Sequence, residues 1–177
     1  TENFHPEVLE SMKKTRKPED YLRMNRNAIK NMIVAGIKPY VNLQVGLSYE
    51  NEEIRQTNID ELQELGQTAK EHNTEIQIYP HLNVVYPGTS DFYSLVQRRV
   101  PENIFETFTK WEDENGIEIK GLLRENHFVH GAGGIPLGIL NFERLREGKF
   151  EIDEARVWKV GEYMDRIREV EGVGIYQ

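Results

Sequence analysis

An alternation of helical and extended segments in the first half of the chain constrains the fold more than any other sequence feature. Pro18 suits the first position of a helix, and Gly36 is well placed to end it. Apolar and polar residues then alternate over residues 40–46, which is the pattern of a half-buried strand. The order repeats, with a helical pattern over residues 51–71 and a strand pattern over residues 75–79. Strands joined by helices at this spacing predict right-handed crossover connections and a parallel sheet.

Two strands cannot form a stable parallel sheet by themselves, because both faces and both edges need cover. The chain begins at Thr1 rather than at Met, and we expect the remaining strands to come from polypeptide upstream of it. The predicted class is therefore α/β, with a parallel sheet.

The segments on either side of this alternation carry weaker signals. Pro6 predicts the start of a short helix, with Val8, Leu9 and Met12 on one face. Further along, we expect a helix over residues 101–116 and one or two strands over residues 117–130. A final helix is predicted from about residue 153 to residue 170, with inward residues Val157, Val160, Met164 and Ile167.

The composition excludes several classes of function. The chain has no cysteine, which rules out disulfides, zinc–thiolate sites and ligation of an iron–sulfur cluster by these residues. Its formal net charge of −8 offers nucleic acid no broad basic surface. No apolar run approaches the roughly 20 residues of a membrane helix, and the first residues lack the pattern of a signal peptide. We therefore expect a cytoplasmic protein without membrane or nucleic-acid partners.

Four segments in a fixed order resemble the radical S-adenosylmethionine (radical SAM) superfamily. Residues 2–14 resemble the segment after the fourth barrel strand, where the family often reads Glu, a small residue, then Ser-Pro-x-Val-Leu-x-x-Met-x-Lys. Residues 35–37 read Ala-Gly-Ile, and residues 41–50 resemble the fifth strand and its Gly-Leu-Pro-Gly-Glu turn. Residues 76–80 and 86–89 resemble the sixth strand and its Pro-Gly-Thr exit. The sequence departs from these patterns where Phe-His replaces small residues near the start, and where Ser-Tyr replaces Pro-Gly in the turn.

The resemblance implies the later β/α units of a partial TIM-type (β/α) barrel over residues 1–97, and a C-terminal α+β extension over residues 98–177 that shapes the substrate site. It also implies a fragment of an enzyme that uses S-adenosylmethionine (SAM) and a [4Fe-4S] cluster. The Cys-x-x-x-Cys-x-x-Cys motif that holds the cluster in this family precedes the fourth strand, so the ligands are expected outside this chain. Reductive cleavage of SAM would give a 5′-deoxyadenosyl radical that modifies a small-molecule or peptide substrate. The implied partners are the N-terminal part of the same enzyme and a reductant such as flavodoxin or ferredoxin. A cobalamin cofactor, the substrate and the later reaction steps stay open.

Candidate ligand-binding residues lie where the predicted strands end, because barrel enzymes bind ligands at the C-terminal ends of their strands. Glu2 matches the family's acidic residue that contacts the ribose or amino group of SAM, and its alternative is a solvated residue at the start of a helix. Asn42 and Gln44 share one strand face and are expected to bind SAM, substrate or another group of the barrel interior. The resemblance places a last group on the adenine side of SAM: Tyr79, His81 and Asn83. The alternatives are a core position for Tyr79 and a surface position for His81.

Other motifs are weaker. Gly46 and Glu50 match the family turn and are expected to shape it, with Glu50 capping the next helix. His127 and His130 are expected to be structural or pocket residues, because no carboxylate pattern for a metal accompanies them. The Gly-rich segment 131–138 fits a substrate lid. Two other readings stay open: a different barrel enzyme that uses this segment as its phosphate-binding loop, and a non-catalytic α/β binding module.

Overall fold

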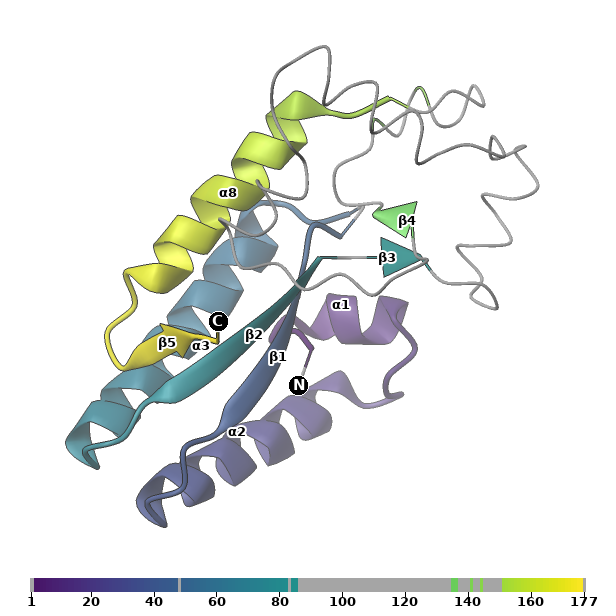
Figure 1. The fold of residues 1–177 in the computed structure, drawn as a ribbon. Helices are drawn as coiled ribbons and strands as arrows, with labels where there is room; N and C mark the ends of the chain where they lie inside the picture. Colours follow the sequence, from purple (N-terminus) through teal and green to yellow (C-terminus); the bar gives the residue numbers. More distant parts are fainter. Residues whose placement is uncertain are drawn as a thin grey trace. The chain divides into compact units, whose positions relative to one another are not determined.

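A computed structural model describes residues 2–47, 49–82, 84–85, 135–136, 141, 144 and 151–176 (Figure 1). The chain divides into two compact units. The first consists of Thr1–Gln44, Glu50–Pro80 and Glu162–Gln177, and the second of Val45–Tyr49 and His81–Gly161. The predicted domain boundary between residues 97 and 98 lies outside the described residues.

Three helices of the first unit begin and end where local sequence signals place them. They are α1 (Pro6–Ser11), α2 (Pro18–Val34) and α3 (Glu52–Glu71). Proline stands in the first turn of α1 and of α2, where its missing N–H has no helical partner to lose. Gly36, with a φ of +73°, follows α2 and donates its N–H to the carbonyl of Ile33 at 2.9 Å. The predicted stop after α3 is also confirmed, since Asn73 has a φ of +52°.

The first unit contains a three-stranded parallel sheet in the order β1-β2-β5. The strands β1 (Tyr40–Val45) and β2 (Ile76–Leu82) are the two predicted ones. The third, β5 (Val173–Ile175), comes from the C-terminus of the chain and was not predicted. It pairs with β2 so that Ile76 lies opposite Val173. The α/β class is therefore confirmed, with a small parallel sheet as its centre.

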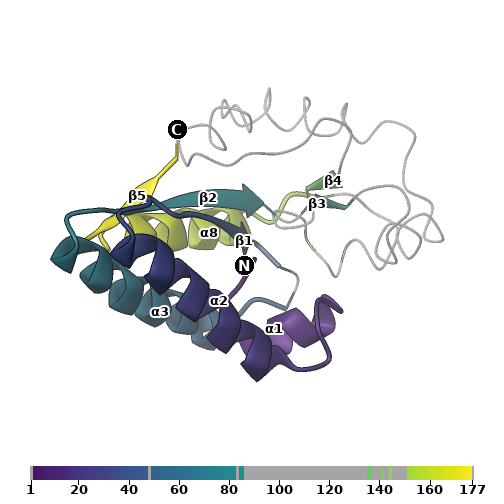
Figure 2. The same ribbon diagram turned by 90° about the horizontal axis from the view of Figure 1, so that it is seen from below.

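The helices of the first unit lie on one face of this sheet (Figure 2). The residues of β1 and β2 that point toward the helices are fully or almost fully buried: Val41, Leu43, Ile76 and Ile78. The alternate residues of β1 point the other way, and there Tyr40 and Asn42 are exposed while Gln44 is half-buried. The predicted division of β1 into an apolar and a polar face is thus confirmed.

Ion pairs join α2 to α3 on the outer side of the helical layer. Arg26 donates from Nε to Glu61 at 2.8 Å, and this hydrogen bond raises the pKa of the guanidinium. Lys30 donates to Glu64 at 2.6 Å and holds the pKa of that carboxyl below its usual range. These contacts are solvent-exposed or partly so, and their contribution to stability is therefore modest.

The last helix, α8 (Glu154–Arg168), confirms the predicted C-terminal helix. Val160, Met164 and Ile167 are buried as expected, whereas Val157 is only half-buried. In the second unit, β3 (Val84–Val85) pairs antiparallel with β4 (Ile135–Pro136), which lies inside the Gly-rich segment. The helix predicted over residues 101–116 and the strands predicted over residues 117–130 lie outside the described residues.

Candidate ligand-binding site

The structure brings two of the predicted site residues together at the C-terminal end of β1. β1 is an edge strand of the sheet, and the backbone N–H of Gln44 donates to the carbonyl of Glu2 at 2.7 Å. The residues that precede α1 therefore lie along the free edge of β1. Asn42 is on the same strand face as Gln44, two residues earlier, and its side chain is exposed.

Two buried asparagines hold this N-terminal segment. Asn3 accepts the backbone N–H of His5 at 2.9 Å, which makes a local turn before α1. Asn58, from the middle of α3, accepts the backbone N–H of Phe4 at 2.8 Å. Both amides are at most 1% exposed. Three backbone hydrogen bonds, at the carbonyl of Glu2 and at the N–H groups of Phe4 and His5, thus fix the path of residues 2–5.

The Glu2 carboxylate lies at the surface and pairs with Lys14. The separation is 2.7 Å, and both side chains are 39% exposed. An exposed pair of this kind costs little to open, because water solvates both charges when they separate. Glu2 can therefore exchange Lys14 for another hydrogen-bond donor, such as a hydroxyl or an ammonium group of a ligand.

The start of α3 is fixed by a cap and by a buried ion pair. Asn51 accepts the N–H of Ile54 at 2.9 Å, so Asn51 is the N-cap and the expectation that Glu50 caps this helix was wrong. Glu50 instead accepts from Nε of Arg55 at 2.8 Å, and its side chain is only 2% exposed. Asn51 has the backbone conformation that suits a cap, which leaves Glu50 one position too early for that role.

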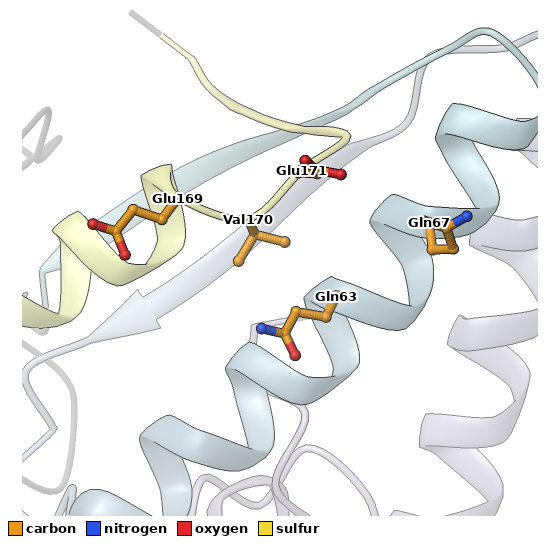
Figure 3. Close-up of a pocket in the computed structure, with 5 residues that line it drawn as sticks. All are labelled: Gln63, Gln67, Glu169, Val170 and Glu171. Carbon is orange, nitrogen blue, oxygen red and sulfur yellow. The ribbon is translucent and has the colours of Figure 1, made fainter.

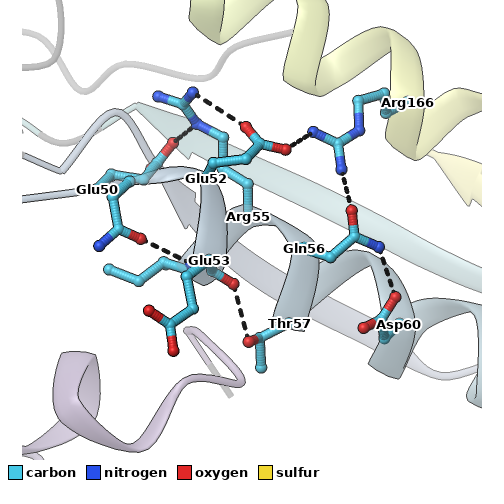
Figure 4. A network of polar contacts seen from close by, with 10 residues as sticks. Glu50, Glu52, Glu53, Arg55, Gln56, Thr57, Asp60 and Arg166 are labelled. Atoms are coloured by element: carbon cyan, nitrogen blue, oxygen red, sulfur yellow. Dashed lines mark hydrogen bonds and ion pairs between the residues drawn. The ribbon is translucent and has the colours of Figure 1, made fainter.

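A chain of polar contacts continues from this pair to α8 (Figure 4). Arg166 of α8 donates to the carboxylate of Glu52 and to the side-chain oxygen of Gln56, each at 2.6 Å. Gln56 in turn donates to Asp60 at 2.6 Å. The contacts are on the solvent side of α3, and they align the last turns of α8 with the first turns of α3.

The buried side-chain polar atoms for which the structure gives no hydrogen-bond partner include Nδ1 of His5 and the hydroxyl of Tyr163. Tyr163, on α8, is 1% exposed. Burial raises the pKa of Tyr163 and the charge of Glu50 raises it further, while the nearby amide of Asn58 has the opposite effect. The phenol is therefore neutral at every physiological pH, and it lies next to the asparagine that holds Phe4.

Tyr79 belongs to an aromatic cluster on the sheet. Its ring centroid lies 5.0 Å from that of Tyr176, which in turn lies 5.8 Å from that of Tyr40. Tyr40 is 62% exposed and Tyr176 is 43% exposed. Tilted and edge-to-face rings at these separations attract one another, and their exposed faces can stack on a planar ligand.

The remaining predicted residues belong to the second unit. His81 is on β2 and is half-buried, and Asn83 lies outside the described residues. Gly46 has a φ of +70°, a conformation that favours glycine and agrees with its expected role in the turn. Leu47, the next residue, accepts from Nη2 of Arg156 at 3.0 Å.

A surface pocket of about 250 Å³ lies at the other end of the sheet of the first unit (Figure 3). It is lined by Gln63 and Gln67 of α3 and by the residues that precede β5, Glu169, Val170 and Glu171. The carbonyl of Gly172, directly after these residues, accepts the N–H of Ile76 at the beginning of β2. The pocket is therefore near the N-terminal ends of the strands, where α/β folds do not usually bind their ligands.

Among the residues that the structure describes, no three His, Asp or Glu side chains come close enough to hold a metal ion. His127 and His130 lie outside those residues. None of the described helices combines the length and the apolar character needed to cross a bilayer. No protein-family model, curated protein or solved structure matches the chain.

Sequence reasoning missed two buried polar residues near the site, Asn58 of α3 and Tyr163 of α8. Asn58 occupies a position of the apolar stripe of α3, between Ile54 and Leu62, and a polar residue at such a position is the signal that identifies it. Tyr163 likewise lies beside Met164 on the buried side of α8. The site as a whole offers amides and one carboxylate for binding and orienting a polar ligand.

Proposed function

We propose that the chain is part of a radical SAM enzyme and binds SAM at the C-terminal end of β1. The observation that carries this proposal is the ordered set of sequence segments from residues 2–14 to residues 86–89 that resemble the family. Among the described residues of the first unit, the helices lie on one face of the parallel sheet, and this supports the proposal, because a barrel has its helices outside and its ligand-facing residues inside. A sheet covered on both faces would have continuous apolar strands instead.

The polar residues of the site suit SAM. Glu2 supplies a carboxylate that can accept from ribose hydroxyls or from the amino group, and the amide of Gln44 can donate or accept. Asn42 and Tyr79 add a further amide and an aromatic ring on the two neighbouring strands. When bound, SAM supplies the radical chemistry, while these residues bind it, orient it and exclude water.

The residues of this chain do not suit an iron–sulfur cluster. Such clusters are held by cysteine thiolates, and the chain has none. In the proposed enzyme the cluster ligands therefore belong to other polypeptide than these residues. No role in cluster binding is assigned to any residue of the chain.

The native protein that contains this chain, purified without oxygen and reduced with dithionite, should convert SAM to 5′-deoxyadenosine. The product is measured by liquid chromatography and mass spectrometry, and iron and sulfide are determined on the same sample. A protein that contains no cluster and releases no 5′-deoxyadenosine would refute the proposal. SAM binding without cleavage would favour a non-catalytic binding module.

The site assignment is tested by replacing Gln44 with Leu. This change keeps the approximate volume and leaves the backbone bond to Glu2 intact, but it removes the side-chain amide. Loss of its hydrogen bonds to a ligand should weaken SAM binding by about 5- to 150-fold, or roughly 1–3 kcal/mol. Binding is measured by calorimetry, with S-adenosylhomocysteine as a ligand that cannot react.

The matched control is Gln77→Leu. Gln77 is half-buried on β2 and donates to Glu75 at 2.9 Å, at the opposite end of the same sheet. The same chemical change there should leave SAM affinity within about twofold of the wild type, a difference below 0.5 kcal/mol. Equal effects of the two substitutions would remove Gln44 from the binding site.

A further inference from the structure

Asn58 is an unusual residue for its position in α3. The buried side of this helix is otherwise made of small or aliphatic residues: Ile54, Ile59, Leu62, Leu65, Gly66 and Ala69. Asparagine is a poor helix former, and burying an amide is costly unless its hydrogen bonds are made. An amide at this position therefore needs a specific partner, and its partner is a backbone group of another segment.

That partner is the N–H of Phe4, which donates to Oδ1 of Asn58 at 2.8 Å. Two residues earlier, the carbonyl of Glu2 accepts the N–H of Gln44 at 2.7 Å. The segment between these two bonds is short, so Asn58 and Gln44 together determine where Glu2 lies. Phe4 is itself 3% exposed, and water cannot replace Asn58 as the acceptor without opening the core.

We propose that Asn58 is a positioning residue that holds Glu2 against Gln44 and so keeps the ligand-binding end of β1 in register. Its effect on SAM binding rests on the proposed function, whereas its effect on the N-terminal segment does not. Asn58 touches no ligand in this assignment and acts only through the backbone of Phe4 and Glu2.

The first test uses no ligand. Amide-resolved hydrogen exchange is measured on the native protein with Asn58→Leu, Asn58→Asp and Asn31→Leu. The Leu variant should accelerate exchange at Phe4 and Gln44 by about 5- to 150-fold, while amides near the middle of α3 stay protected. The Asp variant keeps an acceptor oxygen for Phe4 but buries a carboxyl group, so it should accelerate exchange at Phe4 and Gln44 less than the Leu variant does.

Asn31→Leu is the matched control, because Asn31 is an exposed asparagine on α2. It should leave exchange at Gln44 unchanged. Unchanged exchange at Gln44 in Asn58→Leu would overturn the proposal. A uniform acceleration over the whole first unit in both Asn58 variants would also overturn it, because Asn58 would then be a general core residue.

The second test measures affinity for S-adenosylhomocysteine with the same variants. Asn58→Leu should weaken binding by about tenfold, Asn58→Asp should weaken it less, and Asn31→Leu should bind as the wild type does. Fast exchange at Gln44 combined with wild-type affinity would overturn the positioning role. If the wild type binds no SAM or S-adenosylhomocysteine, the proposed function fails, and the exchange data alone decide whether Asn58 holds Glu2.

Discussion

Replacing Gly66 with Ala should destabilise the protein, although the same change stabilises most helices. Gly66 is an interior residue of α3, where glycine costs about 1 kcal/mol relative to alanine. A Cβ atom at this position would collide with the backbone carbonyl of Glu171 and would lie 3.2 Å from Cγ2 of Val173. The colliding atom belongs to backbone, so it cannot rotate away as a flexible side chain would.

The expected loss follows from these two opposed contributions. Forcing a methyl group into a well-packed contact costs about 1–3 kcal/mol, and the gain in helix propensity offsets up to about 1 kcal/mol of it. Because the colliding atom is backbone, the upper part of the packing cost applies, about 2–3 kcal/mol, and we expect a net loss of about 1–2 kcal/mol. For a chain of this size each kcal/mol corresponds to a decrease of about 2–4 °C in Tm, so the variant should melt about 2–8 °C below the wild type.

Thermal and urea unfolding of the variant measure this loss, and hydrogen exchange locates it. Because the carbonyl of Gly172 accepts the N–H of Ile76, displacement of this turn should accelerate exchange at Ile76. Gly36→Ala is the control, since Gly36 has a positive φ and no neighbour that an added Cβ would meet within 4 Å. The Gly36→Ala variant should be less stable than the wild type, but hydrogen exchange at Ile76 should not accelerate. A Gly66→Ala protein as stable as the wild type, or more so, would show that β5 does not pack against α3 in this way.

Two further predictions concern pH. Burial raises the pKa of Tyr163, so the folded state keeps the phenol protonated, and the stability it contributes is lost as pH rises above the ordinary tyrosine value of about 10. Between about pH 9 and 11, the free energy of unfolding of Tyr163→Phe, measured with urea, should fall less steeply with pH than that of the wild type. An identical slope in the two proteins would contradict a raised pKa for Tyr163. The pKa of Glu64 is lowered by Lys30, so its contribution is present at neutral pH and is lost as pH falls below about 4. Glu64→Gln should reduce the loss of unfolding free energy at acid pH by less than about 1 kcal/mol, because the Lys30–Glu64 pair is largely exposed. A larger effect would mean that this ion pair is better shielded from water than the structure indicates.

The elements that sequence reasoning predicted are those whose signals are local. Gly36 and Asn73 end their helices in left-handed conformations, and Pro18 opens α2 at its first position. The alternation of apolar and polar residues in β1 predicted which residues face the core. Each of these signals lies within a few residues of the feature that it determines, so no knowledge of the tertiary structure was required.

The elements that it missed depend on partners far along the chain. β5 has only three residues, and its pairing with β2 joins Val173 to Ile76, nearly a hundred residues earlier. Gly66 supports this pairing by allowing the turn before β5 to approach α3, yet within its own helix it looks only like an unfavourable residue. The sequence of β5 does not identify β2 as its partner, and the sequence around Gly66 does not identify the turn before β5.

The polar face of β1 connects the fold with the proposed function. A parallel sheet that is buried on both faces is made of continuous apolar strands, whereas β1 alternates and places Asn42 and Gln44 opposite the helices. An amide needs a hydrogen-bond partner from whatever covers it, so Asn42 and Gln44 suit a polar ligand on this face. The N-terminal segment already satisfies the backbone of Gln44 through Glu2. The backbone N–H of Gln44 is therefore bonded along the edge of β1, whereas its side chain lies on the polar face, and this is why we place the proposed ligand site on the face of β1 and not at its edge.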